Sequence, residues 1–172
     1  MSVIAFRMPF GVPGDITRPS TSASTVEAQA FNTSLPFSLY GLPGQVVSGK
    51  FIPIAAQNQT VYGFLVRPFP ITGANASDPL GTSVPPTTGV ANVLRRGYLN
   101  VFVQAGASSC ALGSNVYIRY QNASGSAIVG GIEGVTSGHN YQLSGTYSIS
   151  GSPAYFTGPA DSSGNAEIAW NL

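Results

Sequence analysis

Glycine and proline interrupt this chain so often that little room remains for long helices. The 172 residues include 21 glycines and 13 prolines, about a fifth of the chain, whereas an average protein has about 12% of these two residues together. Glycine weakens a helix interior and proline breaks one. Beyond Gly44 the segments between them are short apolar or β-branched runs without a sustained helical period. This pattern predicts short strands joined by turns.

The last run of the chain shows a clear alternation of period two. Ala166, Ile168 and Trp170 share one phase, so we expect them to face a core or an oligomer interface. Glu167 is in the other phase and is expected to point outward. The run 115–121 alternates in the same way.

The turn spacing predicts an all-β fold, either an antiparallel β-barrel or a jelly-roll-like sandwich of about eight short strands. Residues 1–43 are rich in Pro, Gly, Ser and Thr, and we expect an extended N-terminal arm with one short strand over 26–31. Residues 44–172 form the expected body. A long loop is expected over 73–92, and loops of this length are usually functional or disordered.

Charged residues are unusually scarce. They make up 8% of the chain, against about 25% in an average protein, and the formal net charge is +1. Nucleic acids and anionic membranes both attract clustered cations, so we expect neither as a partner. The mean hydropathy of +0.17 excludes wholesale disorder. A surface with so few charges suits a packed assembly.

No residue pattern predicts a catalytic, cofactor or metal site. His139 is the only histidine and Cys110 the only cysteine, which falls short of a zinc ligand set. Asp161 could orient His139 in a hydrolytic triad, but the chain has no GxSxG motif. The run Gly44–Lys50 matches GxxxxGK, yet Phe51 stands where a P-loop needs Ser or Thr. We expect structural roles for all of these residues, and no secretion signal precedes them.

The C-terminal run Ala154–Leu172, AYFTGPADSSGNAEIAWNL, resembles the ending of the structural cement, or head decoration, proteins of tailed bacteriophages. Gly63–Pro70, GFLVRPFP, is similar to the strand before the long loop of that family. Arg95–Tyr98 (RRGY) and Gly113–Tyr120 (GSNVYIRY) also match its style. The resemblance covers roughly residues 44–172.

The resemblance implies a structural protein with no catalytic residue and no cofactor, on the outer surface of a virion capsid. Its implied partners are the major capsid protein, whose subunit contacts it would reinforce, and further copies of itself in a homodimer or homotrimer. The arm over 1–43 is expected to contact the capsid or to be exchanged between subunits. The suspected packing or interface residues are Trp170, Ile168, Arg95, Arg96 and Phe156.

Three alternatives remain open at the level of the sequence. Another β-rich virion part, such as a tail, neck or fibre component, would share the composition, although fibre-like repeats are not evident. A carbohydrate-binding β-sandwich would use Trp170 and the tyrosines. A hydrolase would depend on His139 and Asp161.

Overall fold

The structure is a computed structural model that describes residues 11–18, 24–57, 59–68, 84–123, 127–143 and 154–172. This part of the chain forms ten strands and one short 3-10 helix, Ala107–Ser109. The strands are β1 Thr25–Phe31, β2 Pro43–Val47, β3 Lys50–Pro53, β4 Gly63–Val66, β5 Val90–Ala105, β6 Tyr117–Arg119, β7 Ile132–Glu133, β8 Asn140–Gln142, β9 Tyr155–Phe156 and β10 Asn165–Trp170. None of these residues belongs to a helix with the length and hydropathy that a membrane span requires.

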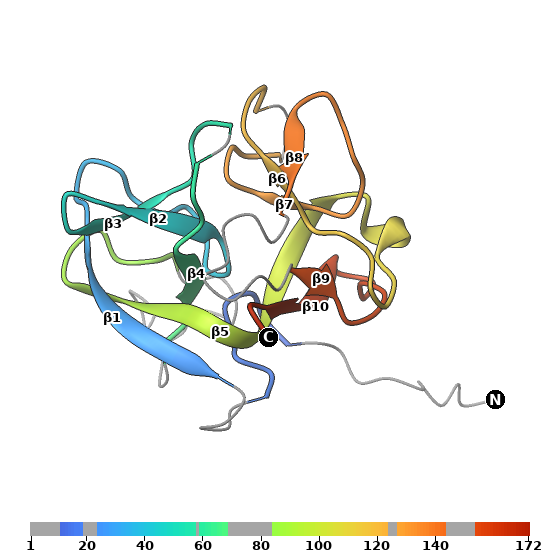
Figure 1. The fold of residues 1–172 in the computed structure, drawn as a ribbon, viewed down its shortest axis with the longest axis horizontal. Helices are drawn as coiled ribbons and strands as arrows, with labels where there is room; N and C mark the ends of the chain where they lie inside the picture. Colours follow the sequence, from blue (N-terminus) through green and yellow to red (C-terminus); the bar gives the residue numbers. More distant parts are fainter. Residues whose placement is uncertain (1–10, 19–23, 58, 69–83, 124–126, 144–153) are drawn as a thin grey trace.

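β5 is the element that both halves of the molecule share (Figure 1). It is 16 residues long, and the two parts of the strand have different neighbours. Residues 90–96 pair with β1 and β4, whereas residues 97–105 pair with β10 and β7. Gly97, where the partners change, has φ 134, a left-handed value that favours glycine.

The first half of the molecule is a closed ring of five strands, called the barrel below. β1 pairs with β5 and, in parallel, with β3. β3 pairs with β2, β2 with β4, and β4 with β5, which completes the ring. Phe37 and Phe51 stack with ring centroids 4.8 Å apart inside one of the two cores. The buried residues of this core are Phe31, Phe37, Tyr40, Leu42, Phe51, Leu65, Ala91 and Val93.

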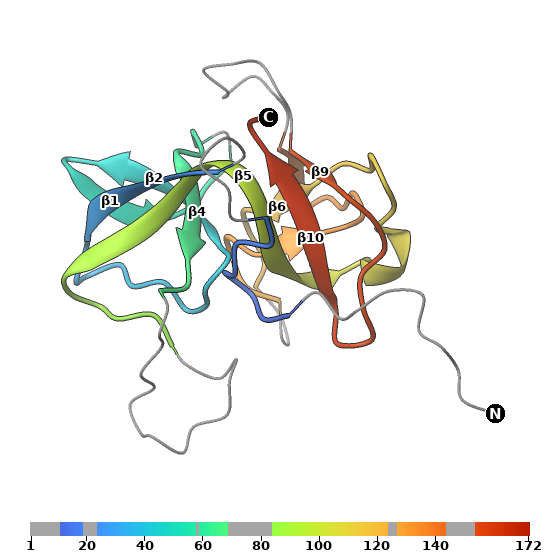
Figure 2. The same cartoon turned by 90° about the horizontal axis from the view of Figure 1, so that it is seen from below.

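The second half of the molecule continues from the C-terminal part of β5. Figure 2 shows β10 beside β5, and β9 pairs with the other edge of β10. β7 runs parallel to β5 and pairs with β6, which pairs with β8. A larger core joins the halves, because Phe64 and Leu94 from the barrel belong to the same buried cluster as Leu99, Ile118 and Ile168.

The strand β4 is buried on both faces, and its sequence shows why. All four of its residues, GFLV, are buried. Phe64 and Val66 belong to the large core, whereas Leu65 between them belongs to the barrel core. A strand covered on both sides needs a continuous apolar run instead of an alternating one.

Residues 11–18 lie alongside β5 and form backbone hydrogen bonds with it. The amide of Gly14 donates to the carbonyl of Asn100 at 2.8 Å, and the amide of Asn100 donates to the carbonyl of Asp15 at 2.9 Å. Ile16 forms an isolated bridge with Leu99. This short segment therefore acts as an added strand along the middle of β5.

Residues 24–43 also belong to the folded body, which differs from the extended arm expected over 1–43. Residues 25–31 are a full strand of the barrel, and Phe37, Tyr40 and Leu42 are buried in its core. These buried side chains come from an irregular segment between β1 and β2, where no period marks them as apolar core positions. The first ten residues lie outside the described part of the chain.

The all-β prediction is confirmed, although the architecture is less uniform than the sequence suggested. The pairs β1–β3 and β5–β7 are parallel, so the sheet is mixed and not purely antiparallel. β5 begins at Val90, within the loop expected over 73–92, and residues 73–83 lie outside the described segments. The run Gly44–Lys50 spans the hairpin of β2 and β3 and opens no helix.

The close approach of β4 to β5 leads to a testable prediction. A Cβ atom on Gly63 would lie 2.4 Å from the Leu94 carbonyl oxygen and 2.6 Å from Cγ1 of Val93. Because these atoms belong to the central strand, Gly63→Ala is expected to lower the free energy of unfolding by about 1–3 kcal/mol. Urea denaturation measures the change. Gly138→Ala is the control, since nothing lies within 4 Å of its Cβ position; equal losses in both variants would contradict the argument.

Candidate interaction surface

Three of the suspected packing residues lie inside the molecule. Trp170 and Ile168 on β10 and Phe156 on β9 are each at most 2% exposed and belong to the large core. The Trp170 ring meets Phe64 edge to face, with centroids 5.4 Å apart. The side chains of Ala166, Ile168 and Trp170 on β10 therefore enter the large core, where Trp170 contacts Phe64 of the barrel strand β4.

Arg95 and Arg96 are neighbours on β5 with different surroundings. Arg95 is partly buried, with its guanidinium 3.6 Å from the Tyr62 ring centroid and its Nε 3.5 Å from a carboxylate oxygen of Glu27. Arg96 is exposed and pairs with Thr25 across the β1–β5 ladder. Alternation along the strand directs the two side chains to opposite sides.

Three arginines, including Arg95, each combine an acidic partner with a tyrosine ring. Arg18 contacts Glu167 at 2.6 Å and lies over Tyr98. Arg67 contacts Asp15 at 3.9 Å and lies over Tyr40. In all three cases one partner belongs to residues 11–31 and another to the rest of the body. These three arginine contacts therefore attach the N-terminal part of the chain to both halves of the molecule.

Glu167 is the polar centre of the contact made by Arg18. The carboxylate accepts hydrogen bonds from Thr17, Arg18 and Thr157. Burial alone would raise the pKa of Glu167, but these donors outweigh it and hold the pKa below the usual value of 4.5. The expected outward position of Glu167 is wrong, because residues 11–18 cover this side of β10 and leave it 5% exposed.

The carboxamide of Asn100 is buried under the same N-terminal segment. Asn100 is fully buried, and neither its Nδ2 nor its Oδ1 has a hydrogen-bond partner among the described residues. A Cβ atom placed on Gly11 of this segment would lie 4.0 Å from Nδ2. An unsatisfied buried amide costs about 1–3 kcal/mol.

The residues that the sequence offered as candidates for catalysis or metal binding form local contacts within the fold. His139 lies in the turn before β8 and contacts Asn122, with Nδ1 3.0 Å from the amide nitrogen. Asp161 accepts two backbone hydrogen bonds in the turn before β10. Burial raises the pKa of the Cys110 thiol to about 11, so it stays protonated at neutral pH. Within the described segments, no group of three acidic, histidine or cysteine residues could hold a metal ion.

One outer surface of the barrel, called the barrel face, carries exposed hydrophobic residues beside Lys50. Val47 pairs with Lys50, Lys50 with Ala30, and Ala30 with Val90, so these four side chains lie side by side across four strands. Val26 and Ala28 continue the row along β1 and are exposed. A solvated sheet face normally carries polar residues at such positions.

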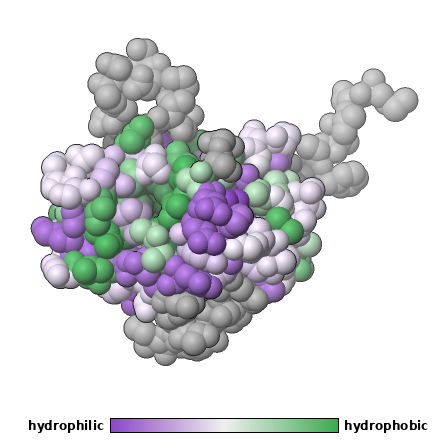
Figure 3. Space-filling model, turned by 90° about the horizontal axis from the view of Figure 1, so that it is seen from above, coloured by the Kyte–Doolittle hydropathy of each residue, from purple (hydrophilic) through white to green (hydrophobic). Residues whose placement is uncertain are grey.

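The exposed hydrophobic residues of the described segments are concentrated in the barrel half of the molecule. Six of the eight large ones come from barrel strands or the loops beside them, and Val90 is 65% exposed. In Figure 3 the groups of hydrophobic residues at the left lie over the barrel end of the molecule. The other two of the eight, Leu112 and Val135, belong to the second half of the molecule.

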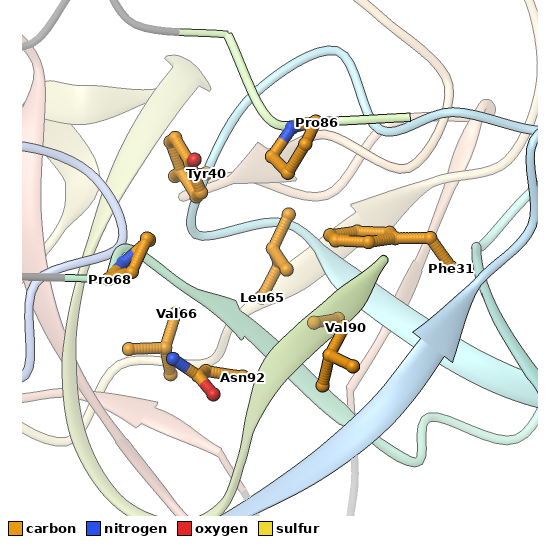
Figure 4. A pocket seen from close by; sticks show the side chains of 9 residues that line it. Phe31, Tyr40, Leu65, Val66, Pro68, Pro86, Val90 and Asn92 are labelled. Carbon is orange, nitrogen blue, oxygen red and sulfur yellow. The ribbon is translucent and has the colours of Figure 1, made fainter. Parts of the chain in front are cut away.

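A cavity at the edge of the barrel face is too small for a ligand. Phe31, Tyr40 and Leu65 form its inner side, and Pro68, Pro86 and Val90 lie around them (Figure 4). Its volume of about 30 Å³ holds one or two water molecules. The residues that line this cavity can add apolar area to a contact made by the barrel face, but the cavity has no room for a cofactor.

Most charged side chains of the described residues form ion pairs within the chain. Four of their arginines form ion pairs, with Asp15, Glu27, Glu133 and Glu167. Lys50 and Arg96 are the described cations outside these pairs. The described surface therefore carries few charges, and those of Arg18, Asp15 and Glu27 are paired within the chain.

The described part is an all-β body with exposed hydrophobic side chains on the barrel. Comparisons with known proteins assign its family. The family model of the XM1 gp53 minor capsid protein matches residues 1–170, so the chain belongs to the XM1 gp53 minor capsid protein family. The protein is thus a structural component of a phage virion and associates with the capsid shell.

A solved structure shares the fold. A chain from "The capsid of Myoviridae Phage XM1" aligns with a TM-score of 0.62 and 17% sequence identity, covering 98% of this chain and 95% of that chain. No curated protein sequence matches the chain. The family match therefore confirms the resemblance to capsid-associated phage proteins, and the structural match confirms the fold.

The environment of Glu167 predicts how stability depends on pH. Because its pKa is lowered on folding, the ionised carboxylate stabilises the fold above about pH 4.5, and this contribution is lost as pH falls through the lowered pKa. Glu167→Gln should cost about 1–3 kcal/mol at pH 7. The gap in melting temperature between the wild type and this variant should narrow on acidification to about pH 3. A gap that stays constant with pH would contradict this role.

The unpaired carboxamide of Asn100 predicts a stabilising substitution. Asn100→Leu replaces the buried amide with an apolar group of similar size and is expected to raise the free energy of unfolding by about 1 kcal/mol. Denaturation of the exposed control Asn92→Leu should show little change. A loss of stability in Asn100→Leu would instead indicate that a buried water satisfies the amide.

Proposed function

We propose that the protein is a capsid cement protein that binds the outer surface of the phage shell across contacts between major capsid subunits. The barrel face carries the proposal. Val26 and Val90 are exposed on the paired strands β1 and β5, and Val47 is exposed on β2, which β3 separates from β1. A surface of this kind commonly marks a protein contact. Burial of apolar surface contributes roughly 25 cal/mol per Å².

The distribution of charge also supports a docking role. The described arginines that pair with acids do so within the chain, so long-range repulsion from the shell or from neighbouring copies is weak. Binding driven by apolar burial depends little on salt, unlike binding through surface ion pairs. A cement protein of this type would stay attached when the ionic strength changes.

On the capsid, the protein would act as an oligomer. We propose a homodimer or homotrimer, because linked copies on a repeating shell gain affinity through avidity. The first ten residues, MSVIAFRMPF, are largely apolar, and we propose that they contact a neighbouring subunit. No catalytic step is proposed, since Asp161, the expected orienter of His139, accepts two backbone hydrogen bonds within its own turn.

A pair of matched variants tests the docking surface. Val90→Asp places a charge on the barrel face, and Leu112→Asp places one on the second half at a similarly exposed position, 77% against 65%. Both proteins should fold normally. Val90→Asp should bind capsids about 30-fold more weakly, because docking would bury an unpaired charge at a cost of about 2 kcal/mol.

Co-sedimentation with capsids that lack the protein measures this binding, and electron cryomicroscopy of the particles shows where it occurs. If Val90→Asp binds capsids normally and Leu112→Asp binds them more weakly, the second half of the molecule contacts the shell instead of the barrel face. Density on the tail or neck instead of the shell would replace cement function with another structural role in the virion.

A further inference from the structure

A polar group stands at the end of the second half, where β6 and β8 meet. The group, called the β6–β8 tip, comprises Tyr120, Gln121, Asn122 and His139. The Gln121 amide nitrogen lies 3.5 Å from the Tyr120 hydroxyl, and the Asn122 amide nitrogen lies 3.0 Å from Nδ1 of His139. Gln121 and Asn122 are exposed. Figure 3 shows hydrophilic residues gathered near the centre of the face on which β6 and β8 lie in Figure 1.

A buried ion pair holds this tip in place. Arg119 is 9% exposed and Glu133 is fully buried, and they meet at 2.6 Å. Another nitrogen of Arg119 donates to the carbonyl of Asn122 at 2.9 Å. Asn122 has φ 55, a left-handed conformation. The ion pair thus fixes the backbone of an exposed residue in a left-handed conformation, which asparagine adopts more readily than most non-glycine residues.

Stability alone is a poor reason for this arrangement. A buried ion pair is often no more stabilising than two packed apolar residues, and a left-handed non-glycine residue adds a local cost. Exposed polar side chains that are fixed by buried neighbours are the usual construction of a binding site. The backbone of His139 is fixed as well, because its carbonyl accepts a 2.9 Å hydrogen bond from the amide of Tyr120.

The chemistry of the tip selects a class of ligand. Its donors and acceptors are amides, an imidazole and a phenol, and the Arg119 charge is already neutralised by Glu133. Phosphate or carboxylate ligands would need an unpaired cation. The rings of Tyr120 and Tyr141, 6.1 Å apart, add apolar surface beside the polar atoms. Alternating hydroxyl groups around an apolar ring face are characteristic of a neutral sugar.

We propose that the β6–β8 tip binds neutral saccharides, with Asn122 and His139 hydrogen-bonding to sugar hydroxyls beside the Tyr120 ring. The inference goes beyond capsid attachment and does not depend on it. In Figure 1, β1 to β3 lie at the left of the molecule, whereas β6 and β8 lie at its upper side, to the right of β2. A protein attached through the barrel face would keep this tip accessible to saccharides at a cell surface.

Titration of the isotope-labelled full chain with glucose, galactose, mannose and N-acetylglucosamine tests the proposal by NMR. At least one sugar should shift the amide signals of residues 119–122 and 137–141 and saturate with a dissociation constant of about 1–10 mM, as expected for a few hydrogen bonds. Inorganic phosphate is titrated in parallel as an anionic probe. Because the isolated protein is used, failure of capsid binding would not affect the result.

Two variants with the same backbone effect separate the ligand contact from local strain. Asn122→Gly accommodates the left-handed backbone but removes the amide, and should weaken binding about tenfold. Ser48→Gly is the control, because Ser48 also has a positive φ, 50, in the exposed turn between β2 and β3, and it should leave binding unchanged. His139→Ala should weaken binding independently. Absence of saturation with all four sugars, equal shifts with phosphate, or equal binding by Asn122→Gly and Ser48→Gly would overturn the proposal.

Discussion

The change of partners along β5 is the constraint on which the rest of the structure depends. One half of this strand closes the barrel with β1 and β4, and the other half carries β10 and β7. Where the two sets of neighbours meet, the strand is covered on both faces at residues 93 and 94, whereas Val90, Asn92 and Arg96 are exposed. Val93 enters the barrel core while Leu94 enters the larger core. Because the two halves share this backbone, neither can rotate against the other without breaking the strand.

The arginine contacts solve a second problem, which is how to hold a turn-rich N-terminal segment without a helix or a disulfide. Arg18, Arg67 and Arg95 each combine a carboxylate with a tyrosine ring. The same contacts pair these charges within the chain, although the side chains of Arg18, Asp15 and Glu27 stay 52%, 43% and 43% exposed. An assembly protein benefits from both effects, since docking then requires little desolvation of charge.

The two ends of the molecule differ in the surface that they present. The barrel end is apolar, with Val26, Val47 and Val90 exposed, whereas the β6–β8 tip carries amides, an imidazole and a phenol. Membership of a minor capsid protein family explains why a small domain would keep an apolar face outside its own core. These two surfaces are the basis of the proposals for shell attachment and saccharide binding.

The sequence by itself determined the class of the fold and several of its strands. The short runs between glycines and prolines predicted an all-β protein, and the alternation of Ala166, Ile168 and Trp170 predicted the phase that enters the core. The same rule failed for Glu167, because a period-two pattern cannot reveal that residues 11–18 cover the second face of β10. The parallel pairs, the shared strand and the barrel face were likewise decided only by the tertiary structure. They depend on contacts between segments far apart in the chain, which local periodicity does not encode.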